Sequence, residues 1–421
     1  MSSFGEEKPL VEHLFRHEAG KLIAVLTKMF GPHNLELAED VVQDTLIKAL
    51  ENWRINGIPQ NPTAWLFTAA RNKALDVVRR ERYKKEFAAE ISPLLKSEFS
   101  AGETIRQLVH ENEIEDEQLR MMFVCCHPSM PEESQVALIL KTLCGFSVAE
   151  IAKAFLTGEE TITKRLYRAR QQFREEKIAF TLPDVNDLPG RLQNVLMAIY
   201  LIFNEGYNST HHTLVIREDL VEESLRLANL IIRHPHTNKP ESLALTALLC
   251  FHAARLYGRV DREGNLVLLK HQDRSQWNYE LIRQGNTFLK QASGGEYVSA
   301  FHVEAAIAYE HCIAASYAET NWKQILELYD ILWQIRPDGI VALNRLIASA
   351  EVNGVRSSLK ALLLLQGDPI LKDYYLYYAT LGDWHAQLGE KDSAKNYFTE
   401  AVHRTESPGE KKLLQQKINA L

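Results

Sequence analysis

The chain has 421 residues, of which 46% are hydrophobic and 24% are charged, and its formal net charge is −7 at pH 7. This length and composition predict a globular protein of about two to four domains, and the net charge excludes a uniformly basic nucleic-acid coat. The longest apolar run, residues 195–203, is too short to span a bilayer, and residues 1–10 lack the apolar core of a secretory signal. We therefore expect a cytoplasmic protein without a membrane partner.

Basic residues gather in two segments. Residues 71–85 hold seven Lys or Arg against two acidic residues, and residues 161–174 hold five against none. Two such clusters on an acidic background indicate a protein that contacts DNA at two places and another macromolecule elsewhere.

The cysteines are few, odd in number and set in apolar sequence, as expected of reduced, buried thiols in a cytosolic protein. They are Cys125, Cys126, Cys144, Cys250 and Cys312. Cys125, Cys126 and His127 are consecutive, which places them on different faces of a helix rather than around one zinc ion. We expect neither a metal nor another cofactor.

Residues 10–53 show helical periodicity with a break at Gly31 and Pro32. The second predicted helix carries an acidic and amide face next to its apolar stripe. This face consists of Glu39, Asp40, Gln43 and Asp44. Such a face is either a plain solvated surface or a docking face for a basic partner.

Residues 54–62, RINGIPQNP, predict a loop, and helical periodicity resumes from Thr63 into the first basic segment. A helix with an aromatic residue and many cations suits single-stranded DNA, which needs stacking surfaces for bases and cations along its backbone. The polar, basic and aromatic candidates are Asn56, Asn61, Trp65, Arg71, Asn72, Arg79 and Arg80. Trp65 taken alone is more typical of a core residue.

Residues 91–116 are polar and acidic and predict a linker. Beyond it, residues 147–174 contain two short amphipathic helices around a break at Thr157 and Gly158, the pattern of a helix-turn-helix. The second helix presents its basic residues to phosphates and to guanine edges, so we interpret it as a recognition helix. The alternative is a solvated helix pair in an ordinary bundle. Glu159 and Glu160 suit the dipole at its first turn and could accept hydrogen bonds from cytosine.

The remainder, residues 185–421, predicts helix after helix. Near residues 340–408 the small and aromatic residues fall at offsets similar to a tetratricopeptide repeat, and Gly354 precedes Gly389 by 35 residues, close to the period of that repeat. This spacing predicts an α-solenoid, whose stacked helix pairs leave a concave face for a partner.

Two polar clusters interrupt this helical half: NEGY at 204–207, followed by His211 and His212, and KHQDRSQW at 270–277. They could form a ligand pocket, or a metal site from Glu205, His211, His212, His271 and Asp273. We favour a structural role, in which Asn204 and Glu205 tie helix ends while Asp273 and Arg274 form an ion pair or contact the N-terminal modules.

Three stretches resemble a known family. AEDVVQDTLIKALENW, PTAWLFTAARNKALDVVRRER and SVAEIAKAFLTGEETITKRLYRAR look like regions two and four of bacterial sigma factors of the extracytoplasmic-function group, in the order of that family. The resemblance implies an all-α chain with region two at 1–90, the linker at 91–116, region four at 117–184 and a C-terminal helical regulatory domain at 185–421. It implies a subunit that binds core RNA polymerase, directs it to promoters and helps to open the minus-ten element.

The resemblance also assigns the candidate residues. Core polymerase docking falls to Glu39, Asp40, Gln43 and Asp44. The resemblance implies that residues 54–62 form the loop that binds a flipped minus-ten base. The minus-ten contacts are then made by residues in and after this loop: Asn56, Asn61, Trp65, Arg71, Asn72, Arg79 and Arg80. Minus-35 recognition falls to Glu159, Glu160, Thr161, Thr163, Lys164, Arg165 and Arg168.

Two other functions are compatible with parts of the sequence. A ligand-sensing helix-turn-helix regulator that does not bind core polymerase would explain residues 147–421, but not the earlier basic, aromatic-containing module. An enzyme would use the two polar clusters. Because promoter opening needs no nucleotide hydrolysis and the chain has no GxxxxGK loop, we expect no enzymatic activity.

The C-terminal half could clasp the DNA-binding modules or brace them on polymerase.

Overall fold

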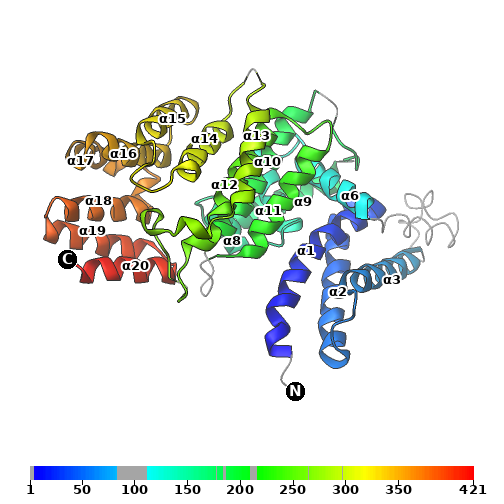
Figure 1. The fold of residues 1–421 in the computed structure, drawn as a ribbon. Coiled ribbons are helices and arrows are strands. Elements are labelled where there is room, and N and C mark those ends of the chain that lie inside the picture. Colours follow the sequence, from blue (N-terminus) through cyan, green and yellow to red (C-terminus); the bar gives the residue numbers. More distant parts are fainter. Residues whose placement is uncertain are drawn as a thin grey trace. The chain divides into compact units, whose positions relative to one another are not determined.

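The computed structural model describes residues 4–82, 111–176, 178–183, 186–208, 216–263, 265–295 and 297–421. Within these ranges every regular element is a helix (Figure 1), which confirms the predicted all-α fold class. No helix among the described residues has both the length and the apolar character needed to cross a membrane.

The chain forms two compact units, Met1–Ile202 and Phe203–Leu421. The division falls inside helix α10 (Leu188–Tyr207), beyond the domain boundary predicted at residue 184.

The first unit begins with α1 (Phe4–Phe30), the 3₁₀ turn η1 (Pro32–Asn34), α2 (Leu35–Asn56) and α3 (Pro62–Arg82). Gly31 adopts φ 84° between α1 and η1, a conformation that favours glycine, so the predicted break is confirmed. The fully buried Trp53 anchors this part by packing against Phe15 and Trp65, with ring centroids 5.4 and 5.6 Å apart.

The loop between α2 and α3 is shorter than predicted. Helix α2 continues through Asn56, so residues 54–56 are helical, and the loop covers only residues 57–61. Asn61 ends the loop by accepting a 2.9 Å hydrogen bond from the backbone N–H of Ala64 at the start of α3.

The second part of this unit comprises α6 (Glu111–Cys125), α7 (Glu132–Thr142), α8 (Val148–Ala154) and α9 (Glu159–Glu175). Residues 91–110 of the predicted linker lie outside the described residues. Residues 111–116 of the predicted linker form the start of α6. From Leu119 onward the apolar residues of α6 are buried, so this helix packs into the core of the unit.

The helix-turn-helix is confirmed in α8 and α9. Ser147 starts α8 with a capping box, in which its hydroxyl accepts from the backbone of Glu150 and the Glu150 carboxylate accepts from the backbone of Ser147. Leu156 takes a positive φ of 50° in the turn. Helix α9 buries one stripe, formed by Ile162, Leu166, Ala169 and Phe173.

The second unit is built around α12 (Pro240–Ala254), whose side chains are buried on nearly every face. It packs against α11 (Glu218–Arg233), α13 (Tyr279–Ala292) and α14 (Ala300–Ile313). Three short 3₁₀ turns connect α12 to α13: η2 (Leu256–Arg259), η3 (Leu269–His271) and η4 (Arg274–Gln276).

The chain continues as consecutive packed helices, seen as the ochre-to-red part of Figure 1. They are α15 (Trp322–Ile335), α16 (Gly339–Asn353), α17 (Val355–Leu363), α18 (Tyr375–Gln387), α19 (Lys391–Arg404) and α20 (Pro408–Asn419), with the turns η5 (Leu364–Gly367) and η6 (Leu371–Asp373) before α18.

Three glycines fit the repeat predicted near residues 340–408. Gly354 and Gly389 both follow helices with positive φ, 87° and 81°. A Cβ atom on Gly382 would lie 2.5 Å from the ring of Phe398, so α18 and α19 approach too closely for any larger residue there. The structure thus supplies the helix pairs on which the repeat prediction depends.

Candidate nucleic-acid and polymerase interface

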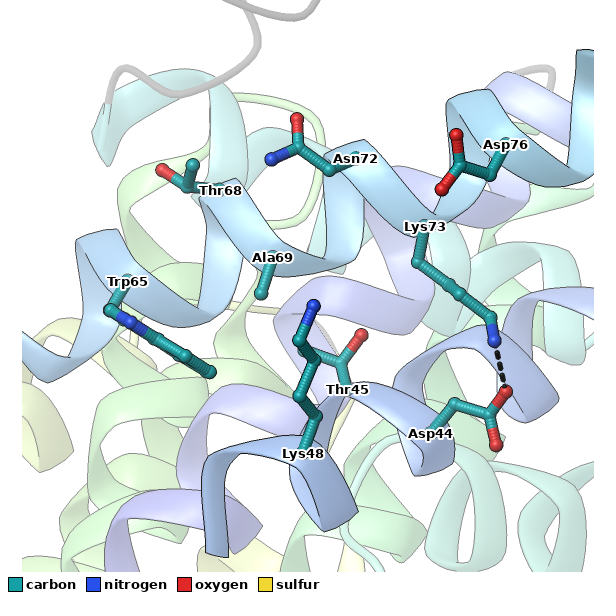
Figure 2. Close-up of a pocket in the computed structure, with 9 residues that line it drawn as sticks. All are labelled: Asp44, Thr45, Lys48, Trp65, Thr68, Ala69, Asn72, Lys73 and Asp76. Carbon is teal, nitrogen blue, oxygen red and sulfur yellow. Dashed lines mark ion pairs between the residues drawn. The ribbon is translucent and has the colours of Figure 1, made fainter. Parts of the chain in front are cut away.

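A groove between α2 and α3 brings together two residue sets that the sequence separated. It has a volume of about 430 Å³, and Asp44 of the predicted docking face lies at one end, with Trp65 and Asn72 of the predicted minus-ten set along α3 (Figure 2). Its lining residues are Asp44, Thr45, Lys48, Trp65, Thr68, Ala69, Asn72, Lys73 and Asp76.

The predicted docking face on α2 is exposed apart from Glu39. Asp40 and Gln43 face solvent, and Asp44 forms a 2.7 Å ion pair with Lys73 across the groove, with about half of each side chain exposed. Such an exposed pair contributes little to stability and leaves the carboxylate accessible.

Sequence reasoning missed two members of this surface. Ile47 and Leu50 have the helical spacing of the apolar stripe, which predicts burial, but their exposed fractions are 47% and 42%. They follow Gln43 at i+4 and i+7, so they extend the acidic and amide face with apolar side chains on the same side of the helix. This spacing from Gln43 is the sequence signal that could have revealed them. Apolar spacing alone, however, does not distinguish residues that pack in the core from residues that are exposed for a partner.

Glu39 forms contacts within the first unit instead of facing solvent. Its carboxylate accepts hydrogen bonds from the Arg170 guanidinium at 2.9 and 3.1 Å and from the hydroxyl of Thr142 at 3.1 Å. The side chains of Glu39 and Arg170 are 21% and 22% exposed. Glu39 therefore differs from Asp40, Gln43 and Asp44, since it joins α2 to the recognition helix.

The predicted minus-ten residues lie on one continuous stretch. Asn56 is exposed at the end of α2, Trp65 is partly buried beside Trp53, and Asn72 and Arg79 are exposed on α3. Arg71 is partly buried. Asn61 acts as a cap of α3, and the side chain of Arg80 lies outside the described residues.

Helix α9 exposes most of its predicted base-reading residues. Those exposed are Glu159, Glu160, Thr161, Thr163, Lys164 and Arg168. Arg165 differs, because it forms an ion pair with Glu133 of α7 and stands 5.6 Å from the centroid of the Phe155 ring. Tyr167, 63% exposed on the same helix, was not predicted.

The basic face of α9 is divided between two directions. Arg170 and Arg174 pair with Glu39 and Glu36 of α2, the latter at 2.8 Å, so they do not belong to the outer face that the sequence predicted. The sequence could not show this, because both partners lie more than 100 residues away along the chain.

The two polar clusters of the second unit meet around α12 and the turns that follow it. Arg259 donates to the backbone carbonyl of Tyr207 and to Asn208, and Arg274 lies over Trp277. The predicted Asp273–Arg274 ion pair is wrong. Asp273 instead accepts from the backbone N–H and hydroxyl of Ser275, and Arg274 donates to two backbone carbonyls.

The imagined metal site is not formed by described residues. His211 and His212 lie outside them, and among the described residues no group of three or more His, Cys, Asp or Glu is arranged to hold a metal ion.

Three protein-family models match the chain. Sigma-70 region 2 matches residues 14–83, Sigma-70 region 4 matches residues 120–173, and a family of unknown function, DUF6596, matches residues 191–293. The matched sigma segments contain the α2–α3 groove and the helix-turn-helix, respectively.

The similar proteins include ECF RNA polymerase sigma factors. An uncharacterized protein of Rhizobium meliloti (strain 1021) is 33% identical over 388 residues, covering 92% of this chain and 90% of its own length. The ECF RNA polymerase sigma factor EcfG of Rhodopseudomonas palustris (strain TIE-1) is 32% identical over 140 residues, 33% of this chain and 70% of its own. The ECF RNA polymerase sigma factor SigE of Mycolicibacterium smegmatis is 28% identical over 168 residues, 40% of this chain and 61% of its own. No solved structure matches.

The contact between Glu39 and Arg170 generates a stability prediction. In a double-mutant cycle with Glu39→Gln and Arg170→Ala, we expect a coupling free energy of about 1–2 kcal/mol, because the pair is partly buried and uses both carboxylate oxygens. The more exposed pair of Glu36 and Arg174 should couple by about 0.5 kcal/mol or less. Amide hydrogen exchange of α9 in the full chain measures both, and equal coupling in the two cycles would contradict the assignment.

Proposed function

The chain belongs to the bacterial sigma factors of the extracytoplasmic-function group with a C-terminal helical extension, and we propose that it directs core RNA polymerase to specific promoters and initiates transcription there. The observation that carries the proposal is the exposed face of α2, where Asp40, Gln43 and Asp44 adjoin Ile47 and Leu50. A helix-turn-helix regulator that acts without polymerase has no use for such a surface.

The α2 face has the composition of a protein-protein interface. Ile47 and Leu50 provide apolar area that gains free energy when water is removed, and the carboxylates of Asp40 and Asp44 provide the charge that selects a basic partner surface. Their positions on neighbouring turns of one helix let a single partner surface cover all four. We infer that core polymerase docks here.

The groove between α2 and α3 supports the assignment of minus-ten contacts. Extruding a base from the duplex costs a few kcal/mol, which is offset when the base enters a pocket and the unpaired strand meets cations. Trp65 and Asn72 line the groove and offer an aromatic surface and an amide, and the exposed Arg79 lies farther along α3. In our proposal the melted strand follows α3.

Helix α9 supports the assignment of minus-35 recognition. Lys164 and Arg168 are exposed at i and i+4, so they project from one face and could enter the major groove together. Arg165, held by Glu133, is better placed to support the helix or to contact phosphate than to read a base.

The second unit is proposed to modulate this activity. Its stacked helices give a surface of the kind by which α-solenoids bind a partner segment. That segment would belong either to polymerase or to the first unit of the same chain.

Transcription in vitro tests the proposal directly. Purified full-length protein and core polymerase, given a promoter library, should initiate from a defined subset of sequences, and a chain truncated near residue 202 should change the yield. The control is core polymerase alone. If no promoter is used by either form of the protein, or if the protein does not copurify with core polymerase, the proposed function is wrong.

Charge reversal on the docking face should impair assembly. We expect Asp44→Arg to weaken binding to core polymerase by about tenfold or more, since like charges then meet at the interface. Lys73→Ala is the matched control, because it breaks the same ion pair while keeping the carboxylate. Binding measured with labelled core enzyme should be near normal for the control, and equal loss in both variants would place the effect in the α2–α3 packing instead.

Removing one exposed arginine from α9 should relax promoter choice. Arg168→Ala is expected to cost about 1–3 kcal/mol of discrimination at one or two minus-35 positions, because a base-reading contact is lost. Arg174→Ala, on the same helix but directed to α2, should leave the ranking of promoters unchanged. The ranking is read by sequencing transcripts from the library, and an unchanged ranking for Arg168→Ala would remove this residue from base recognition.

A further inference from the structure

Three arginines of the second unit lie together around two aromatic rings. The Arg259 guanidinium stands 3.6 Å from the centroid of the Tyr207 ring, and those of Arg255 and Arg274 stand 6.0 and 4.5 Å from the Trp277 ring. Arg255 is 6% exposed and Trp277 is 3% exposed. The cluster unites the polar segments 204–207 and 270–277, which the proposed function leaves unused.

No carboxylate among the described residues forms an ion pair with these three arginines. Their hydrogen bonds go to neutral acceptors: the hydroxyl of Tyr207, His252, Asn208, and the backbone carbonyls of Tyr207, His311 and Ala314. Residues 209–215, STHHTLV, contain no acidic residue. Burial lowers the pKa of Arg259, and Tyr207 and, more weakly, Glu410 act in the opposite direction; the Glu410 carboxylate itself accepts hydrogen bonds from the hydroxyls of Tyr375 and Thr405.

Two guanidinium donors are left over inside the cluster. Arg255 Nε and Arg274 Nη2 are buried and have no hydrogen-bond partner, and Nδ1 of His311 beside them also lacks one. A buried charged group without a counter-charge is costly, and attraction to an aromatic ring compensates for only part of that cost. The cluster therefore offers the donors and the positive charge that an anionic group can use.

The neighbouring histidines add no positive charge to the cluster. Burial, together with Arg255 and Arg274, lowers the pKa of His311 to about 3, and burial with Arg255 and Arg259 holds the pKa of His252 well below its usual range. Both rings are neutral at pH 7. Arginine is not deprotonated in proteins, so the cluster carries the full charge of its three guanidinium groups.

We propose that this cluster, Arg255, Arg259 and Arg274 with Trp277 and Tyr207, binds a small organic anion. Its carboxylate or phosphate group takes the unused donors of Arg255 and Arg274, and its apolar body lies against Trp277. Arginine suits this task because its planar fork matches both oxyanions. The site lies wholly in the second unit, so the inference does not depend on the proposed sigma function.

Calorimetric titration of the full-length protein tests the site. The probes are phenyl phosphate and benzoate, with inorganic phosphate and acetate as the same charged groups without an aromatic body, and benzyl alcohol as the uncharged analogue. All are compared at equal ionic strength set with sodium chloride, because charged sites are screened by salt. We expect saturable binding of one molecule of an anionic probe per chain, tighter with the aromatic body, and none for benzyl alcohol.

Variants locate the binding. Arg255→Lys and Arg274→Lys keep the charge but lose the guanidinium fork, and each should weaken binding of the preferred probe by about tenfold or more. Arg283→Lys is the matched control, since Arg283 is 76% exposed on α13 and paired with Glu280. It should bind as the unaltered chain does.

Hydrogen exchange of the unaltered protein covers the case in which the lysine variants do not fold. The bound anion should slow exchange in α12 and in residues 269–277. The proposal is overturned if no anionic probe binds better than chloride, if both lysine variants bind normally, or if the protection maps to another part of the chain.

Discussion

The carboxylate of Glu39 links the two sigma-like parts of the first unit. It lies on the helix that carries the proposed polymerase face, and it accepts hydrogen bonds from Arg170 of the recognition helix and from Thr142 of the helix between them. The pair is partly shielded from water, so we expect it to be stronger than the more exposed pair of Glu36 with Arg174. This interaction therefore adds to the packing of α1 on α6 and to the ion pair of Lys28 with Glu117 in joining two modules with separate sigma signatures.

Much of the first unit could be predicted from sequence because its signals are local. Apolar periodicity gave α1, α2 and α3, Gly31 marked the first break, and the spacing in residues 147–174 gave α8 and α9. What could not be predicted is which cations face inward. Arg165 and Arg170 read as equivalent outer residues, and only tertiary partners, Glu133 and Glu39, distinguish them from Arg168.

The second unit shows the same limit more strongly. The sequence singled out residues 204–207 and 270–277 and left two roles open for Asp273 and Arg274, an ion pair or a contact with the N-terminal modules. The structure joins these segments through Arg255 and Arg259, at the end of α12 and in the turn after it, which carried no motif of their own. A buried cationic cluster is a property of packing, and no periodicity or spacing reveals it.

The exposed Ile47 and Leu50 have a further consequence for the unbound polypeptide. Apolar side chains left in contact with water on one helical face attract other apolar surfaces, including those of a second copy. In the free chain this apolar area stays hydrated, and a complex with the proposed partner would remove it from water.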